Sequence, residues 1–298
     1  MKTTRAQVKS IIEANIHLDG VSQTSLKHCS LARFSSPGVT IPALYVPSVC
    51  LIVNGSKTAA TEERSISYNE EHCLVASMNV PTMALIERAS AEAPYLGIQI
   101  ELDIPLLRKL AESLDIYRST PIQEDPFCLA VAALEAPFLA SVAHYLSLLE
   151  TPSDIADLQE VRLLEVYSRL LRGPHAPSIL TLLQSDSHSE KISRAVSYIS
   201  NNLSQPITIE KLATVATMST SSFHQHFKNL IDFSPLQYIK RTRLIEARKL
   251  MLLDGLNAAK ASFHVGYESP SQFSRDYRRL FGQPPKKDVA QLHERFIQ

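Results

Sequence analysis

The amino-acid sequence predicts an α+β protein, with a small N-terminal β-barrel, a helical connector and an all-α C-terminal domain. Three observations predict this class. Short β-type runs punctuated by proline fill the first hundred residues, helical patterns follow, and the charge balance reverses near residue 185. Residues 1–185 contain 14 Lys and Arg against 20 Asp and Glu, whereas residues 186–298 contain 16 against 10. We therefore expect two domains, the basic one meeting a polyanion, unless the charges are scattered by chance.

The β-type region extends over about residues 26–102. Its clearest strand is Tyr45–Val53, which is rich in β-branched residues and ends at the hairpin-turn pair Asn54-Gly55. Further strands are expected at 65–68, 73–78 and 95–102. Several short strands separated by turn residues favour a small antiparallel barrel or sandwich.

Helices are expected over about residues 104–172. Ile104–Leu114 has proline in its first turn, and 126–150 is expected to form one or two further helices. Residues 153–172 form an amphipathic pattern that ends at Gly173-Pro174, which suits either core packing or pairing with a second copy. We predict a regulatory or dimerisation domain over 1–180, a linker over 181–188 within the polar stretch 175–189, and a third part over 189–287.

Two segments of this third part share one design. The first, over about 208–229, is a short helix, a tight turn and a second helix capped by Ser219. Phe223 and Phe227, four residues apart, face the core. Outward-facing side chains could therefore contact phosphates or base edges; these are Thr220, Ser221, His224, Gln225 and Lys228.

The second segment, over about 257–281, repeats the pattern. Ser269 caps its second helix, Pro270 follows, and Phe273 and Tyr277 repeat the aromatic pair. Its outward-facing side chains are Ser271, Gln272, Arg275 and Arg278. A long helix over about 235–253 would set the separation of the two helix-turn-helix units, which can enter successive major grooves about 34 Å apart. One unit alone is common, but two units capped alike within the basic half indicate DNA binding.

At these residues the sequence resembles the AraC/XylS family of bacterial transcription regulators. The resemblance covers about residues 190–285 and is strongest in Val265–Pro285, with Met218–Lys228 similar to the family's first recognition helix. It implies base-edge or phosphate contacts from Ser221, His224, Gln225, Ser271, Gln272 and Arg275. It also implies an activator that works with RNA polymerase on double-stranded DNA.

Departures from the family pattern concern the second unit. Ala258 and Ala261 stand where the family usually has isoleucines, and Lys286-Lys287 replaces its common aromatic-arginine pair. The second unit is therefore expected to pack more loosely. Basic side chains suited to phosphate contacts, which set affinity and its salt dependence, are Lys228, Lys240, Arg241, Arg243, Arg278 and Arg279.

The N-terminal half is similar to a domain of one AraC-type subgroup, at 45–55, 72–77 and 166–174. The resemblance implies a cupin-like barrel that binds an unknown small-molecule effector or mediates a homodimer. A cupin-type enzyme fused to a DNA-binding domain is the alternative, and an architectural protein with an oligomerising front domain is a third hypothesis. A cupin metal site needs a His-x-His pair on one strand, whereas the predicted strands offer only His72 beside Cys73 and, on an earlier strand, His28 beside Cys29. These residues could converge, but single histidines in strands are more often core or rim residues. No metal, cofactor or catalytic residue is therefore predicted.

The four cysteines carry a weaker hypothesis. They occur singly, without a C-x-x-C pair, which fits a reducing cytoplasm rather than a disulfide framework. Cys50 and Cys73 lie in predicted strands and could act as thiol sensors, although buried structural cysteines are the more ordinary interpretation. The longest apolar run has eight residues, from Phe127 to Leu134, so neither a membrane span nor a secretion signal is expected.

Overall fold

The computed structural model describes residues 1–116, 127–184 and 186–296. Its N-terminal part contains two antiparallel sheets with strand orders β1-β2-β9-β4-β7-β10 and β3-β8-β5-β6. The strands are β1 Gly20–Gln23, β2 Cys29–Phe34, β3 Thr40–Tyr45, β4 Ser48–Asn54, β5 Ser56–Ala60, β6 Ser65–Asn69, β7 His72–Ala76, β8 Val80–Arg88, β9 Tyr95–Glu101 and β10 Leu129–Ala133. The predicted α+β class is confirmed, with the β-domain built as two sheets rather than one closed barrel.

Strand β10 corrects the expectation of helix over 126–150. It pairs antiparallel with β7 at the edge of the larger sheet, with Leu129 opposite Ala76. A short apolar run has no diagnostic period, so pairing with an available edge decides its conformation. Helix begins only at Ala136, and residues 117–126 of the predicted helical region lie outside the described residues.

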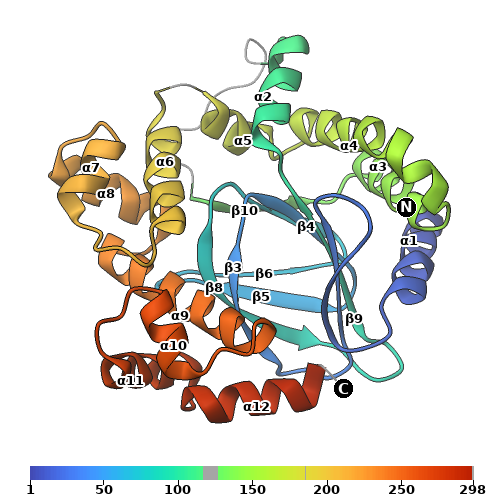
Figure 1. Cartoon of the computed structure of the whole chain (residues 1–298). Coiled ribbons are helices and arrows are strands. Elements are labelled where there is room, and N and C mark those ends of the chain that lie inside the picture. The colour runs from blue at the N-terminus through green and yellow to red at the C-terminus, as the bar shows by residue number, and fades with distance from the viewer. Residues whose placement is uncertain (117–126, 185, 297–298) are drawn as a thin grey trace.

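Helices α1–α5 pack on the larger sheet and form one core with it. They are α1 Lys2–Asn15, α2 Ile104–Ser113, α3 Ala136–Leu146, α4 Ile155–Arg172 and α5 Ala176–Leu183, with the short 3-10 helices η2 Ser147–Leu149 and η3 Pro152–Asp154 before α4. Helix α5 occupies part of the predicted linker, because Ile179, Leu180 and Leu183 are buried in this core. Figure 1 shows α1, α3 and α4 on the side of the sheets away from α6–α12.

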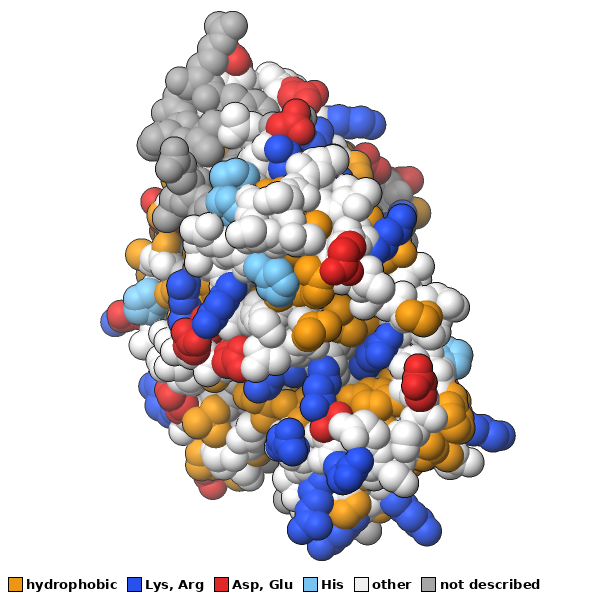
Figure 2. Space-filling view, turned by 90° about the vertical axis from the view of Figure 1, so that its left-hand side faces the viewer, with side chains coloured by type: hydrophobic (Ala, Val, Ile, Leu, Met, Phe, Trp, Pro, Cys, Tyr) orange, Lys and Arg blue, Asp and Glu red, His pale blue; other side chains and the backbone are white. Residues whose placement is uncertain are grey.

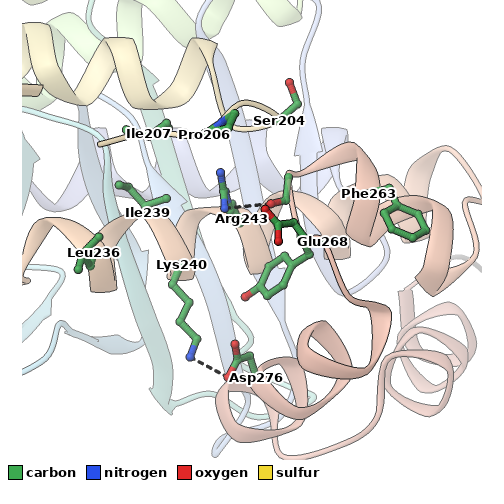
Figure 3. Close-up of a pocket in the computed structure, with 12 residues that line it drawn as sticks. Ser204, Pro206, Ile207, Leu236, Ile239, Lys240, Arg243, Phe263, Glu268 and Asp276 are labelled. Carbon is green, nitrogen blue, oxygen red and sulfur yellow. Dashed lines mark hydrogen bonds and ion pairs between the residues drawn. The ribbon is translucent and has the colours of Figure 1, made fainter. Parts of the chain in front are cut away.

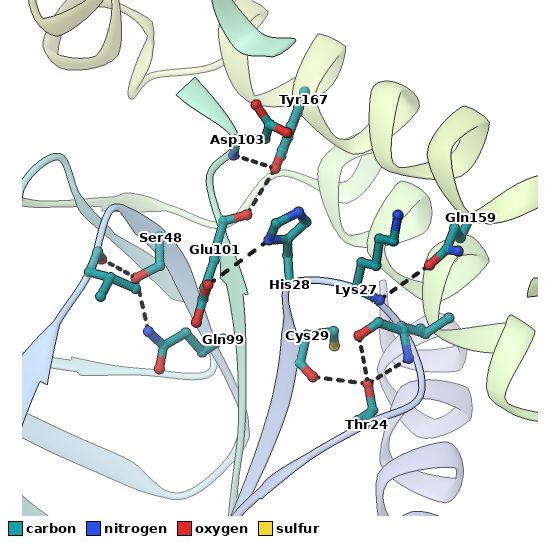
Figure 4. A network of polar contacts seen from close by, with 12 residues as sticks. Thr24, Lys27, His28, Cys29, Ser48, Gln99, Glu101, Asp103, Gln159 and Tyr167 are labelled. Atoms are coloured by element: carbon teal, nitrogen blue, oxygen red, sulfur yellow. Dashed lines mark hydrogen bonds and ion pairs between the residues drawn. The ribbon is translucent and has the colours of Figure 1, made fainter. Parts of the chain in front are cut away.

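Tyr167 fastens α4 to the end of β9. Its hydroxyl donates to the carbonyl of Glu101 at 2.8 Å and accepts from the amide of Asp103 at 2.9 Å (Figure 4). The Asp103 carboxylate in turn caps α2 by accepting from the amide of Leu106. These hydrogen bonds to backbone groups, in addition to apolar packing, hold α4 and α2 against the end of β9.

All regular elements described after residue 186 are helices. The helices are α6 His188–Asn201, α7 Ile209–Val215, α8 Thr220–Ile231, α9 Pro235–Leu253, α10 Ala258–His264, α11 Pro270–Phe281 and α12 Pro285–Phe296. Helices α6–α8 lie beside the sheets at the left of Figure 1, and α9–α12 continue below them. None of the described helices is long and apolar enough to cross a membrane.

The buried cores divide this helical part in two. One cluster contains residues between the two sheets together with the apolar residues of α6–α8 and the start of α9, including Phe223, Phe227 and Tyr238. A separate cluster contains Leu244 and Met251 of α9 with residues of α10 and α11. The first helix-turn-helix unit therefore shares its core with the β-domain, whereas the second has a core of its own.

Candidate nucleic-acid interface

The first helix-turn-helix unit consists of α7 and α8. Thr208 and Ser219 cap these helices through side-chain oxygens that accept from backbone amides three residues later. Phe223 and Phe227 are fully buried, with ring centroids 5.3 Å apart. The opposite face of α8 is solvent-exposed, and it carries Ser221, His224 and Gln225 as the sequence predicted.

The second unit, α10 and α11, is capped in the same way by Asn257 and Ser269. Phe273 and Tyr277 are buried, while the predicted outward side chains Ser271, Gln272 and Arg275 are exposed. Arg275 donates to the Gln272 side chain at 2.8 Å, and Gln272 donates to Asp276 at 3.0 Å. The polar face of α11 is therefore held in a defined arrangement before any ligand is present.

An aromatic series fills the interior of this second unit. Ring centroids of Tyr267 and Phe273, Phe273 and Tyr277, and Tyr277 and Phe281 lie 5.3, 5.5 and 4.3 Å apart. Ala261 is fully buried against this core. Ala261 and the large rings of Phe273 and Tyr277 belong to one buried cluster. The looser packing of the second unit stays a prediction.

Helix α9 joins the two units through Arg243. Its guanidinium donates to the carbonyls of Leu203 and Gln205, before the first unit, and of Gly266 in the second unit's turn, at 2.9–3.1 Å. Gly266 has φ +85°, and a Cβ there would lie 2.5 Å from the Leu203 carbonyl oxygen. The turn therefore requires glycine for its conformation and for this close approach.

A groove of about 620 Å³ lies between the two units, lined by α9, the α6–α7 loop and the turn of the second unit (Figure 3). Lys240 crosses it to pair with Asp276 of α11 at 2.7 Å. The Asp276 carboxylate is nearly buried, and the ammonium of Lys240 helps to hold its pKa below the ordinary value despite burial. Lys240 and Arg243 therefore fix the relative position of the units.

The predicted phosphate contacts are placed unequally. Arg278 and Arg279 at the end of α11 are exposed. Arg241 is partly buried over the ring of Phe233, and Lys228 pairs with Glu63 of the β-domain at 3.0 Å. Figure 2, which faces α7 and α8, shows Lys and Arg side chains gathered over the lower part of this side.

Helix α12 was not predicted, and it adds two exposed lysines to the basic surface, Lys286 and Lys287. It is anchored by the buried carboxylate of Asp288, which pairs with Arg248 at 2.8 Å and accepts from the Tyr277 hydroxyl at 2.6 Å. The proline at the start of α12 and an acidic residue in its first turn were available signals in the sequence.

A contact between the two parts of the chain involves Asp232, which ends α8 in the left-handed conformation at φ +67°. Its buried carboxylate accepts from the Thr61 hydroxyl at 2.5 Å and from the amides of Glu63 and Arg64 at 2.9 and 3.1 Å. Residues 61–64 form the turn between β5 and β6. We call this contact, the turn 61–64 with Asp232, the interdomain clasp.

Further hydrogen bonds surround the clasp. The Tyr238 hydroxyl donates to the Asn79 carbonyl at 2.9 Å, and the Cys128 amide donates to the Leu230 carbonyl at 2.8 Å. Gln237 donates to Glu62 at 2.6 Å. The first helix-turn-helix unit is therefore fastened to the β-domain by polar contacts as well as by a shared apolar core.

The two predicted sensor cysteines are both buried. Cys73 Sγ lies 3.1 Å from His175 Nε2, and burial raises the pKa of this thiol to about 12 while lowering the pKa of His175 to about 4. Burial also raises the pKa of Cys50. Among the residues that the structure describes, no group of three or more His, Cys, Asp or Glu could hold a metal ion.

Comparison with known proteins gives two family matches. The sequence model described as "AraC-type transcriptional regulator N-terminus" matches residues 25–178, about half of the chain, and a "Helix-turn-helix domain" model matches residues 212–291. The chain belongs to the AraC-type transcriptional regulators. The resemblance inferred from the sequence motifs is thereby confirmed for both parts of the chain.

Individual relatives agree with this assignment. The chain is 30% identical over 98 residues to the HTH-type transcriptional regulator GbdR of Pseudomonas aeruginosa, covering 33% of this chain and 27% of that protein. It is 24% identical over 151 residues to the HTH-type transcriptional activator RhaS of Escherichia fergusonii, covering 50% and 53%. The chain thus spans about a quarter to a half of the length of these relatives.

A crystal structure of an apo variant of ToxT from Vibrio cholerae resembles the whole fold. The TM-score is 0.61 at 10% identity, over 92% of this chain and 99% of that one. At this level of identity the likeness concerns the fold, namely the order of a β-domain, connecting helices and two helix-turn-helix units.

Proposed function

We propose that the protein is a sequence-specific DNA-binding regulator of transcription, acting as an activator in the cytoplasm. Its N-terminal domain would sense a small-molecule effector or mediate a homodimer, and RNA polymerase would be a partner on the DNA. Membership of the AraC-type family and matches to regulators in the helical part support a regulatory rather than an enzymatic role.

One observation carries the proposal. Two similarly capped helix-turn-helix units are fixed to one long helix, α9, and each exposes polar side chains on its second helix. Ser221, His224 and Gln225 would read the first major groove, and Ser271, Gln272 and Arg275 the second. Arg278 and Arg279, both exposed, would add phosphate contacts.

Selection of bound duplexes from a random DNA pool, at two salt concentrations, tests this function. We expect an enriched sequence with two half-elements about one helical turn apart. Loss of binding at modest salt without enrichment would contradict specific recognition and leave a weak polyanion surface or an architectural role.

Two matched substitutions then separate base reading from phosphate contact. We expect Arg275→Ala to weaken the selected sequence by about 1–3 kcal/mol and to relax discrimination in the second half-element. Arg278→Ala should instead weaken selected and random DNA alike and reduce the salt dependence. Equal weakening on both DNAs by Arg275→Ala would make that side chain a phosphate contact.

A further inference from the structure

A partly buried lysine occupies the space between the two sheets. Lys57 extends from β5, and its Nζ lies 5.3, 5.5 and 5.9 Å from the ring centroids of Tyr45, Tyr68 and Tyr95. Tyr68 is its direct cross-strand partner on β6. The surrounding rings stabilise an ammonium through their faces but offer it no negative charge.

Lys57 lines a cavity of about 90 Å³ between the sheets. Tyr45, Tyr95 and Cys50 line it too, together with apolar side chains such as Ile86. Within the described residues no carboxylate lines this cavity. A cation held there is therefore without an acidic partner, which is costly unless a ligand supplies one.

Two hydroxyl groups beside Lys57 are also unsatisfied. Tyr45 and Tyr68 are 4% and 3% exposed, and in the described structure the hydroxyl of each is buried without a hydrogen-bond partner. Buried hydroxyls normally have partners, so two hydroxyls without one, beside an ammonium that has no carboxylate partner, indicate a missing acceptor.

The protonation states suit an anion. Burial opposes the charge on Lys57, but the surrounding phenol groups and the Cys50 thiol favour it, and its pKa lies above the ordinary value. Burial likewise raises the pKa of Tyr68, and that of Tyr95 to about 12. At neutral pH the site therefore presents one cation and protonated hydroxyls, all of which are donors.

We propose that this cavity binds a small carboxylate anion, which pairs with Lys57 and accepts a hydrogen bond from Tyr45; all three groups meet there because Lys57 and Tyr45 both line the cavity. A cavity of about 150 Å³ accommodates benzene, so the space of about 90 Å³ here suits a ligand of roughly four non-hydrogen atoms, the size of acetate. The short alkyl part of such a ligand would lie against the apolar wall. The inference rests on the proposed sensing role, and it gives that role a ligand class.

The position of Lys57 connects the site with the DNA-binding part. Strand β5 ends at Ala60, and the next residue, Thr61, donates to Asp232 in the interdomain clasp. A ligand bound at Lys57 thus contacts the strand that continues into the turn 61–64, and this turn contacts the first helix-turn-helix unit at Asp232.

Calorimetric titration of the full-length protein, without DNA, tests the site. The ligands are acetate, its neutral isostere acetamide, and the longer carboxylates up to hexanoate. We expect saturable binding of a short carboxylate, with the amide at least about tenfold weaker because it lacks the charge. Equal affinity for acid and amide, or absence of binding across the series, would overturn the proposal.

Variants assign the binding to this cavity. Lys57→Met should abolish carboxylate binding, whereas the exposed Lys27→Met should leave it unchanged. If Lys57→Met fails to fold, Tyr45→Phe, which removes one hydroxyl that lines the cavity, should weaken binding by about tenfold. Unchanged binding in Tyr45→Phe, or in a folded Lys57→Met, would refute this placement. Because the titration is carried out without DNA, a failure of carboxylate binding leaves the result of the DNA selection unaffected.

Discussion

Asn in place of Asp232 is expected to loosen the first helix-turn-helix unit from the β-domain. Asparagine is the suitable replacement because it tolerates the left-handed conformation at φ +67°, whereas alanine would add backbone strain. The substitution keeps the size of the side chain and removes its charge. Any effect then reports the hydrogen bonds of the interdomain clasp together with the ion pair between Asp232 and Arg64, whose Nε lies 3.7 Å from the carboxylate.

The size of the effect follows from three donors. The carboxylate accepts from the Thr61 hydroxyl and from the amides of Glu63 and Arg64, and its side chain is 4% exposed. Each hydrogen bond to a charged group contributes about 1.5–3 kcal/mol, and an amide oxygen can replace only part of them. Because the turn itself is exposed, water can satisfy some freed donors, so we expect Asp232→Asn to cost about 2–4 kcal/mol.

Urea unfolding, followed by tyrosine fluorescence and circular dichroism, measures this cost. Asp254→Asn, at the exposed end of α9, is the matched control and should change the unfolding free energy little. Thr61→Val completes a double-mutant cycle, with an expected coupling of about 1 kcal/mol or more. Additive effects of the two substitutions, or equal curves for the 232 and 254 variants, would refute the clasp as an energetic contact.

Three further predictions concern other buried contacts. Arg243→Met should destabilise the protein by about 2–3 kcal/mol, since its half-buried guanidinium serves three carbonyls, and should weaken DNA with two half-elements more than a single half-element; equal losses on both probes would contradict a role in joining the units. Stability should fall as pH drops from about 6.5 towards 4, by up to about 3 kcal/mol from His175, because its pKa is lowered to about 4 in the folded state and the unfolded chain takes up the proton first; His175→Gln should flatten this part of the pH profile in urea unfolding. Cys50 and Cys73 should resist alkylation by iodoacetamide in the folded protein because burial raises both pKa values; rapid native modification, with reporter induction lost in the Ser variants, would instead support the thiol-sensor hypothesis.

Local signals in the sequence were sufficient to predict the helices and turns of the two helix-turn-helix units. Capping residues, aromatic pairs at i and i+4, and the glycine in the second turn act within one unit, so they are visible in a short window. The same holds for α2, with Pro105 in its first turn, and for strand β4, with its β-branched run.

Features that depend on distant partners were not predictable in this way. The apolar run 129–133 becomes a strand because the edge of β7 is free to pair with it. Arg243 and Lys240 were expected to meet phosphate, but their roles are set by carbonyls and a carboxylate far along the chain. Lys57 carries no local signal at all, since its significance comes from three tyrosines on different strands.

The two helix-turn-helix units differ in how they are attached, and this difference limits how a signal could reach DNA. The first unit shares a core with the β-domain and is held by the interdomain clasp. The second has a separate core and is linked to the first through α9, with Arg243 and Lys240 as polar contacts. A change at β5 would therefore act on the first unit directly and on the second through α9. Effector-dependent binding should accordingly change at the first half-element and in the spacing between half-elements, while the second half-element alone keeps its affinity.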